Sequence, residues 1–384
     1  MKVLLIGNLA ADRQESMQRF TALLHSGLLA RGHHVTVCAP TLRLARLGPG
    51  YRYGGLPKYL GYVDKFMLFP RELRRLIRSD RPDVVHITDH SNAVYESAVG
   101  NVPVLATCHD LLQIRAARGE VPLQTVGRVG RRYQAWILAS LVRLKNLACV
   151  STRTRSDVLR LTGLPDRQVT LILNGLNYPY QPVPAATAHL RLTALCGRHL
   201  TDPARLDPAL GGFLLHVGGA QWYKNREGLI AIHAHLRRLL SPAPRLVIVG
   251  PPLTPAQSAL AAQLGVSESI VSLGSVTNPE LEALYNLAEG LVFPSWDEGF
   301  GWPIAEAQSC ACPVFTSNRA PMTEIGGPMS VYFDPENPEQ AARAIAAAWP
   351  ARTALRHHAL IASRRWQPAL MLEAYEALYR RLVP

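Results

Sequence analysis

Residues 290–306 read Gly-Leu-Val-Phe-Pro-Ser-Trp-Asp-Glu-Gly-Phe-Gly-Trp-Pro-Ile-Ala-Glu. An apolar run leads into a glycine-rich loop and then into Pro303, which suits the first turn of a helix, so the stretch predicts strand, loop and helix. The glycines leave backbone N–H groups unshielded and a helix start is electropositive, which suits a diphosphate. The bracketing carboxylates, Glu298 and Glu306, can accept hydrogen bonds from sugar hydroxyls. On spacing alone, a plain loop glutamate and a helix-surface glutamate are the commoner interpretation.

Strands and helices alternate through the rest of the 384 residues, which is typical of parallel, doubly wound sheets. The predicted strands are residues 2–6, 35–38, 83–87, 102–107, 148–151 and 169–173 in the first half, and 213–217, 246–249, 270–273, 290–294 and 313–317 in the second. We therefore expect an α/β chain with two Rossmann-like doubly wound parallel-sheet domains facing across a cleft, where ligands of such sheets usually bind.

Domain boundaries follow from a break in this pattern. From about Tyr178 to Gly212 the chain is rich in proline at first and does not continue the alternation. We expect a first domain at 1–180, a linker at 181–211 and a second domain at 212–365. The helix at 366–384 is expected to pack back on the first domain. Its apolar residues at helical spacing are Leu370, Leu372, Tyr375, Leu378 and Leu382.

The Glu298–Glu306 segment, with Phe-Pro-Ser before it and residues 311–318 (Ala-Cys-Pro-Val-Phe-Thr-Ser-Asn) after it, resembles the Glu–seven–Glu motif of retaining GT-B glycosyltransferases of family 4. The resemblance covers nearly the whole chain. It implies an N-terminal acceptor-side domain and a C-terminal nucleotide-sugar donor domain. It also implies that Glu298 holds donor-sugar hydroxyls and that Glu306 binds the ribose hydroxyls. Backbone N–H groups near the sugar and diphosphate would come from Gly299, Phe300 and Gly301.

A second motif, Val-Gly-Gly-Ala-Gln-Trp-Tyr-Lys-Asn-Arg at residues 217–226, ends a predicted strand in glycines and places a cation before a helix. Lys224 can neutralise a leaving nucleoside diphosphate, with Gly218 and Gly219 beside the donor. In the family that this segment resembles, an arginine also flanks the turn, but here that position is Gly219. Arg226 is expected to substitute as a donor contact. The alternative is that Lys224 is an exposed residue at a helix start.

Polar residues also close two predicted strands of the first domain. Thr-Cys-His-Asp at 107–110 ends one strand, and His109 resembles the family histidine that approaches the reacting end of the donor sugar. Asp89, and with it Asp110, are expected on the acceptor side. The alternative for His109 is a hydrogen-bonded structural histidine. The loop after the first strand departs from the family, because Asp12–Met17 stands where a glycine pair is usual.

Charge is distributed unevenly. Residues 1–185 hold 25 Lys and Arg against 12 Asp and Glu, whereas residues 186–384 hold 16 of each. Such a basic half suits a phosphorylated substrate or an anionic membrane. The predicted helix after the apolar run Phe66–Phe69 could rest on a bilayer through its arginines, which are Arg71, Arg74, Arg75 and Arg78. Arg128, Arg131 and Arg132 add to this basic surface. A solvated helix face is the alternative. The expected location is the cytoplasm, on the inner face of the plasma membrane if the membrane interpretation holds, and no nucleic acid is expected as a partner.

No cofactor is expected, since the chain has no Asp-x-Asp pair to hold a divalent ion and no His/Cys cluster. The implied activity is a retaining, metal-independent transfer of a hexose from GDP-mannose or a UDP-hexose. The expected acceptor is a glycan or a lipid-linked glycan in surface polysaccharide synthesis. The missing arginine and the unusual first loop leave an alternative, a non-catalytic sugar- or lipid-binding protein on the same fold.

Overall fold

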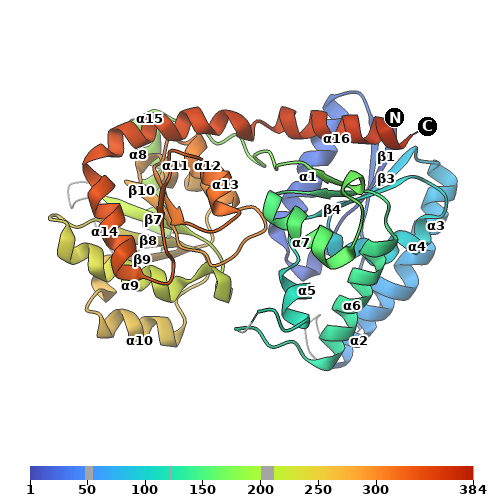
Figure 1. Ribbon diagram of the computed structural model, residues 1–384, viewed down its shortest axis with the longest axis horizontal. Helices are drawn as coiled ribbons and strands as arrows, with labels where there is room; N and C mark the ends of the chain where they lie inside the picture. Colours follow the sequence, from blue (N-terminus) through green and yellow to red (C-terminus); the bar gives the residue numbers. More distant parts are fainter. Residues whose placement is uncertain (48–54, 122, 200–211, 384) are drawn as a thin grey trace. The chain divides into compact units, whose positions relative to one another are not determined.

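The computed structural model describes residues 1–47, 55–121, 123–199 and 212–383. These residues form two compact units (Figure 1). Unit 1 comprises Met1–Asn177 together with Pro368–Pro384, and unit 2 comprises Tyr178–Gln367. The chain therefore passes between the units twice, and the C-terminal segment belongs to the same unit as the N-terminal half.

Unit 1 contains a six-stranded parallel sheet with the order β2-β1-β3-β4-β5-β6. Its strands are β1 (Lys2–Ile6), β2 (His34–Cys38), β3 (Val84–Ile87), β4 (Val104–Cys108), β5 (Leu147–Cys149) and β6 (Val169–Leu171). Its helices are α1 (Glu15–Ala30), α2 (Gly55–Val63), α3 (Phe69–Asp80), α4 (Glu96–Val99), α5 (Leu112–Ala117), α6 (Arg128–Arg143), α7 (Thr152–Thr162) and α16 (Pro368–Leu382). The strand order reverses between β1 and β3, where ligands of open parallel sheets bind.

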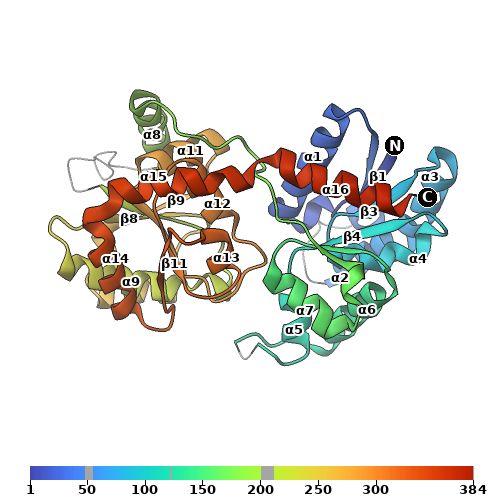
Figure 2. The same ribbon diagram turned by 45° about the horizontal axis from the view of Figure 1, so that its top comes forward.

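Alternate strand residues of unit 1 face two helical layers, because side chains of a strand point to opposite faces in turn. Leu4, Val85 and Leu147 join one core cluster with residues of α3 to α7. On the opposite face α16 packs beside α1 (Figure 2). The buried α16 residues are Met371, Leu372, Tyr375, Glu376, Leu378 and Tyr379, whereas Leu370, which we expected to pack, is 53% exposed.

Unit 2 contains a second six-stranded parallel sheet, with the order β12-β11-β10-β7-β8-β9. Its strands are β7 (Phe213–Val217), β8 (Arg245–Val249), β9 (Ile270–Gly274), β10 (Gly290–Phe293), β11 (Val314–Ser317) and β12 (Val331–Phe333). Its helices are α8 (Ala185–His199), α9 (Arg226–Leu239), α10 (Pro255–Gln263), α11 (Asn278–Leu287), α12 (Trp302–Ser309), α13 (Met322–Gly326), α14 (Pro338–Ala348) and α15 (Arg352–Ala362). Here the order reverses between β7 and β10, so the loops after these two strands meet at the expected ligand edge.

The segment predicted to be a linker is largely part of unit 2. Residues 185–199 form α8, which packs on α11. Arg191 of α8 forms an ion pair with the buried Glu282 at 2.6 Å, and the backbone N–H of Val183 donates to Asn286 Oδ1 at 2.9 Å. The prolines that interrupt the strand–helix pattern precede this helix, which explains why it was missed. Residues 200–211 of the predicted linker lie outside the described residues.

Candidate active site

The two strongest sequence signals meet at the strand-order reversal of unit 2. The loop after β7 carries Lys224 and the loop after β10 carries Glu298, and Lys224 Nζ lies 2.7 Å from Glu298 Oε1. The two side chains are only 12% and 9% exposed. A cation and a carboxylate that are both largely withdrawn from water interact more strongly than a surface pair. Lys224 and Glu298 are 74 residues apart in the sequence, so the sequence alone did not predict this contact.

The loop after β7 holds Lys224 over aromatic rings. Its Nζ lies 5.0 Å from the ring centroid of Phe293 and 5.5 Å from that of Tyr223. Both distances are within the range of cation–π attraction. The ammonium group therefore has a defined place even before any ligand is considered.

Asn225 joins the two loops and was missed by the sequence analysis. It adopts a left-handed backbone conformation, with φ of 52°, which asparagine tolerates better than most residues. Its Oδ1 accepts from the N–H of Gly228 and so caps α9, while its Nδ2 donates to the carbonyl oxygens of Pro294 and Pro335. The side chain thus fixes the end of β10 relative to the start of α9.

The glycine-rich loop ends as the sequence predicts. Gly301 has φ of 98°, a conformation that favours glycine, and α12 follows with Pro303 in its first turn. Phe300 is buried and contacts Trp366 with ring centroids 5.6 Å apart. This contact anchors the backbone of Gly299, Phe300 and Gly301, the three residues proposed to offer N–H groups to the donor.

Glu306 lies on α12 and is 5% exposed. Tyr285 of α11 donates a hydrogen bond from its hydroxyl to Glu306 Oε2 at 2.9 Å. Burial raises the pKa of Tyr285 well above its ordinary value, and the neighbouring carboxylate adds to the rise, so the phenol remains a donor. This bond orients the Glu306 carboxylate from within the unit.

Arg226, expected to contact the donor, is placed differently. It is 1% exposed, and its guanidinium donates to the carbonyl oxygens of Gly218 at 2.7 Å and Pro251 at 2.8 Å. Burial lowers its pKa. Arg226 therefore holds the loops after β7 and β8 together. Gly219 follows in the same loop, where a side chain would overlap Gln221.

In unit 1, His109 follows β4 and is 4% exposed. Its Nε2 lies 2.9 Å from the carbonyl oxygen of Thr88. Because a carbonyl only accepts, Nε2 carries the proton and Nδ1 the lone pair. The rings of Phe20 and His109 pack in a T-shaped arrangement with centroids 4.6 Å apart, and burial lowers the pKa of His109. His109 is thus a neutral, oriented imidazole at the carboxyl end of the sheet.

Asp89 follows β3 and lies beside the end of β1. Asn8 Nδ2 donates to Asp89 Oδ2 at 2.5 Å, and the N–H of Ser91 donates to Asp89 Oδ1 at 3.0 Å. Burial alone would raise the pKa of Asp89, but hydrogen bonding and the charge of His90 outweigh it and hold that pKa well below its ordinary value. The carboxylate organises the strand ends in this structure, and a role toward an acceptor remains a proposal.

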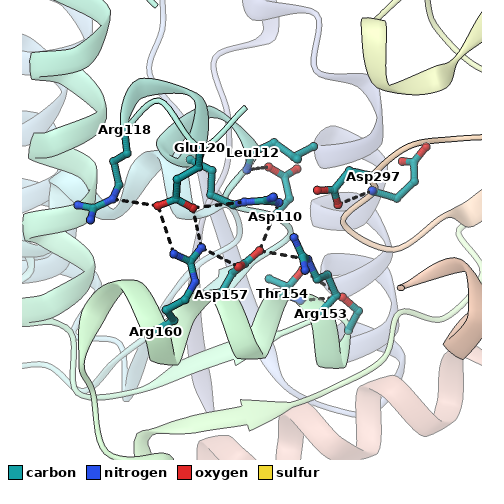
Figure 3. A network of polar contacts seen from close by, with 12 residues as sticks. Asp110, Leu112, Arg118, Glu120, Arg153, Thr154, Asp157, Arg160 and Asp297 are labelled. Atoms are coloured by element: carbon teal, nitrogen blue, oxygen red, sulfur yellow. Dashed lines mark hydrogen bonds and ion pairs between the residues drawn. The ribbon is translucent and has the colours of Figure 1, made fainter. Parts of the chain in front are cut away.

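Asp110 accepts a hydrogen bond from the N–H of Leu112 and begins the turn into α5. Close by, Glu120 and Asp157 lie among arginines (Figure 3). Their partners are Arg115, Arg118, Arg153 and Arg160, at 2.8 to 3.8 Å. Hydrogen bonding from Arg160 lowers the pKa of Glu120. Four guanidinium groups around Glu120 and Asp157, with Asp110 close by, leave this part of unit 1 with a small excess of positive charge.

Comparison with known proteins follows the division of the chain. Residues 17–178 match the family described as Glycosyltransferase Family 4, and residues 209–362 match the family described as Glycosyl transferases group 1. The chain belongs to these GT-B glycosyltransferases. Among the described residues, no three His, Cys, Asp or Glu side chains gather as a metal site would require.

Two curated relatives come from Escherichia coli. The serotype-specific mannosyltransferase WbdA is 26% identical over 68% of this chain and 32% of its own length. The O-antigen chain mannosyltransferase B is 32% identical over 52% of this chain and 50% of its own length. The chain thus spans between about a third and a half of the length of these relatives.

A solved structure, a sucrose-phosphate synthase from Thermosynechococcus elongatus, has the same fold. It superposes with a TM-score of 0.75 at 18% identity and covers 100% of this chain, which in turn covers 99% of that chain. At this identity the likeness establishes the fold and leaves the substrate open.

Proposed function

We propose that this protein transfers a hexose from a nucleotide sugar to a glycan or lipid-linked acceptor in surface polysaccharide synthesis, with retention of anomeric configuration. The observation that carries the proposal is the 2.7 Å contact between Lys224 and Glu298 at the strand-order reversal of unit 2. A cation for a diphosphate and a carboxylate for sugar hydroxyls are the two groups that an activated sugar requires. GDP-mannose is the first candidate donor, because both E. coli relatives are mannosyltransferases, and UDP-hexoses are the second.

In this mechanism the nucleoside diphosphate leaves first and the sugar becomes oxocarbenium-like. Lys224, the N–H groups of the 299–301 loop and the start of α12 stabilise the departing charge. The acceptor hydroxyl attacks from the face that the diphosphate leaves, and a departing phosphate oxygen takes its proton. The neutral His109 is proposed to assist the transfer. No metal ion is required, because the cation and the helix start supply the positive charge.

A donor screen tests this function. Thermal unfolding with GDP-mannose, UDP-glucose, UDP-galactose and ADP-glucose should identify one donor, and NMR of the product should show the donor's anomeric configuration. Activity should survive EDTA. An inverted product would contradict retention, and loss of activity in EDTA would contradict metal independence. Donor binding without turnover over a panel of glycan and lipid-linked acceptors would support the non-catalytic alternative.

A peripheral membrane contact is also proposed, with the α6 part of the predicted basic surface as its first candidate. Phe69 is 3% exposed and belongs to the core, and Lys65 forms an ion pair with Asp12. Of the apolar run 66–69, Met67 is clearly exposed, at 53%, so this run offers little apolar surface to a bilayer. Helix α6 exposes more, with Val129 at 66% and Trp136 at 41%. Exposed arginines share this stretch, namely Arg128, Arg131 and Arg132.

Vesicle binding tests the α6 surface. None of the helices in the described part of the chain is long and apolar enough to cross a bilayer. The wild type should sediment with phosphatidylglycerol vesicles, whereas the Arg131→Glu/Arg132→Glu variant should remain in the supernatant. The comparison variant, Arg74→Glu/Arg75→Glu, makes the same change of charge on α3, the other helix predicted for the contact. A larger loss for the α3 variant would favour α3 over α6, and equal losses would mean that only net charge matters. If the wild type itself does not bind the vesicles, the membrane proposal fails.

A further inference from the structure

His216 of β7 is a buried histidine that the proposed mechanism does not use. It is 0% exposed, and its Nδ1 lies 3.0 Å from the carbonyl oxygen of Val292 on the neighbouring strand β10. Because the carbonyl can only accept, Nδ1 carries the proton. Nε2 therefore bears a lone pair.

That lone pair has no hydrogen-bond partner among the residues that the structure describes. A buried acceptor without a donor is costly, and such atoms are uncommon in folded proteins. Protonation does not resolve the situation. Burial, aided by the charges of Arg226 and Lys224, lowers the pKa of His216 to about 3. The ring is neutral and retains an acceptor to which none of the described residues donates.

The acceptor lies next to the Lys224 side chain. A Cβ placed on Gly218 would be 3.3 Å from His216 Nε2 and 3.3 Å from Lys224 Cδ, so both groups border the same glycine. The His216 ring also stacks on Phe293, with centroids 6.3 Å apart, and Lys224 Nζ lies 5.0 Å from the centroid of that Phe293 ring. Lys224 carries the donor group that the lone pair lacks.

We propose that His216 is a positioning residue for Lys224, whose ammonium donates to His216 Nε2 when a nucleoside diphosphate is bound. The inference rests on the proposed function. A bound nucleotide sugar competes for both members of the Lys224–Glu298 pair, so the ammonium needs another acceptor to hold it toward the diphosphate. A neutral imidazole provides one without cancelling the positive charge, as a second carboxylate would.

A double-mutant cycle tests this coupling. Calorimetric titration would use whichever of UDP, GDP and ADP stabilises the wild type most. His216→Phe keeps an aromatic ring at this position and removes the acceptor, and we expect its Kd for that diphosphate to be about tenfold higher, the scale of a hydrogen bond to a charged group. In a Lys224→Met background the same change should leave Kd unaltered. His216→Gln, which retains an acceptor, should recover most of the loss.

The outcomes separate the two proposals. If the wild type binds none of the diphosphates, the proposed function fails and this inference fails with it. If the wild type binds and His216→Phe binds equally well, or loses the same factor with and without Lys224, only the positioning role is overturned. NMR of 15N-histidine-labelled wild type covers the case in which His216→Phe does not fold. The Nε2 resonance should move to the hydrogen-bonded position on adding the diphosphate, and an unmoved resonance would overturn the inference.

Discussion

Asn225 Nδ2 lies 3.1 Å from the carbonyl oxygen of Pro294, so a single side chain ties the loop after β7 to the end of β10. These are the two loops that carry Lys224 and Glu298. The geometry of the candidate donor site therefore depends on a residue that need not touch the donor itself.

Asn225→Ala should lower the free energy of unfolding by about 3 kcal/mol, because two carbonyl oxygens lose a donor and α9 loses its cap. The matched control is Asn337→Ala, which removes an exposed asparagine cap from α14 and should cost about 1 kcal/mol. Urea unfolding of both variants measures the difference. Equal losses would show that the bridge between the loops adds nothing to ordinary capping.

Lys224→Met should weaken nucleoside diphosphate binding by about 10- to 100-fold and lower kcat/KM by about 100- to 1,000-fold, because the departing charge loses its cation. Glu298→Gln should leave diphosphate binding within about threefold yet weaken binding of the whole nucleotide sugar. Arg238→Met, which removes an exposed cation of α9, is the control. Calorimetry with each ligand distinguishes the two roles, and an identical profile for both variants would contradict them.

Gly27→Ala should destabilise unit 1 by about 1–3 kcal/mol, because the added methyl group overlaps Leu372 of α16. Trimming the partner in a Gly27→Ala/Leu372→Ala double variant should cost less than the sum of the two single changes. Gly197→Ala in α8 meets no atom within 4 Å and should leave stability unchanged or slightly higher. Thermal unfolding of these variants measures the changes in stability. Strictly additive losses would show that the added methyl group does not clash with Leu372.

Stability should fall as the pH drops below about 6.5, with His233 as one contributor. Burial, with a smaller effect from Arg237, lowers its pKa to about 3. Between this pKa and the pKa of about 6.5 in the unfolded chain, only the unfolded chain binds the proton. The contribution of His233 to the free energy of unfolding is therefore fully present above pH 6.5 and is lost on acidification. His233→Gln should reduce the slope of unfolding free energy against pH by about 1.4 kcal/mol per unit. Urea unfolding from pH 7.5 to 5 measures this slope. An unchanged slope in the variant would show that His233 does not contribute to the pH dependence of stability.

The sequence was sufficient to predict the two parallel sheets, because nearly every strand is a short apolar run that ends in glycine, a polar residue or a turn. The sequence analysis did not predict β12, Val331–Phe333. The helix α8 was missed because prolines at its entrance resemble a linker. Phe69 was assigned to a surface cluster because the residues before α3 are uniformly apolar, which leaves the buried face undetermined.

The candidate site was predicted only in part. Lys224, Glu298 and Glu306 stand in recognisable motifs, but motifs do not report contacts. Arg226 follows Lys224 by two residues, and only the folded loop shows that its guanidinium is directed to backbone carbonyls. Asn225 and His216 left no signal, because their importance comes from partners 69 and 76 residues away.

The discontinuity of unit 1 has a consequence for biosynthesis. Unit 2 is one continuous segment that needs no residue translated after it, whereas unit 1 is completed only by α16, which is translated after all of unit 2. Until then the nascent sheet lacks the hydroxyl of Tyr379, which bonds His86 Nδ1 at 2.7 Å, and that of Tyr375, which bonds Thr107 at 2.9 Å. The earliest residues to emerge are thus among the last to reach their final partners.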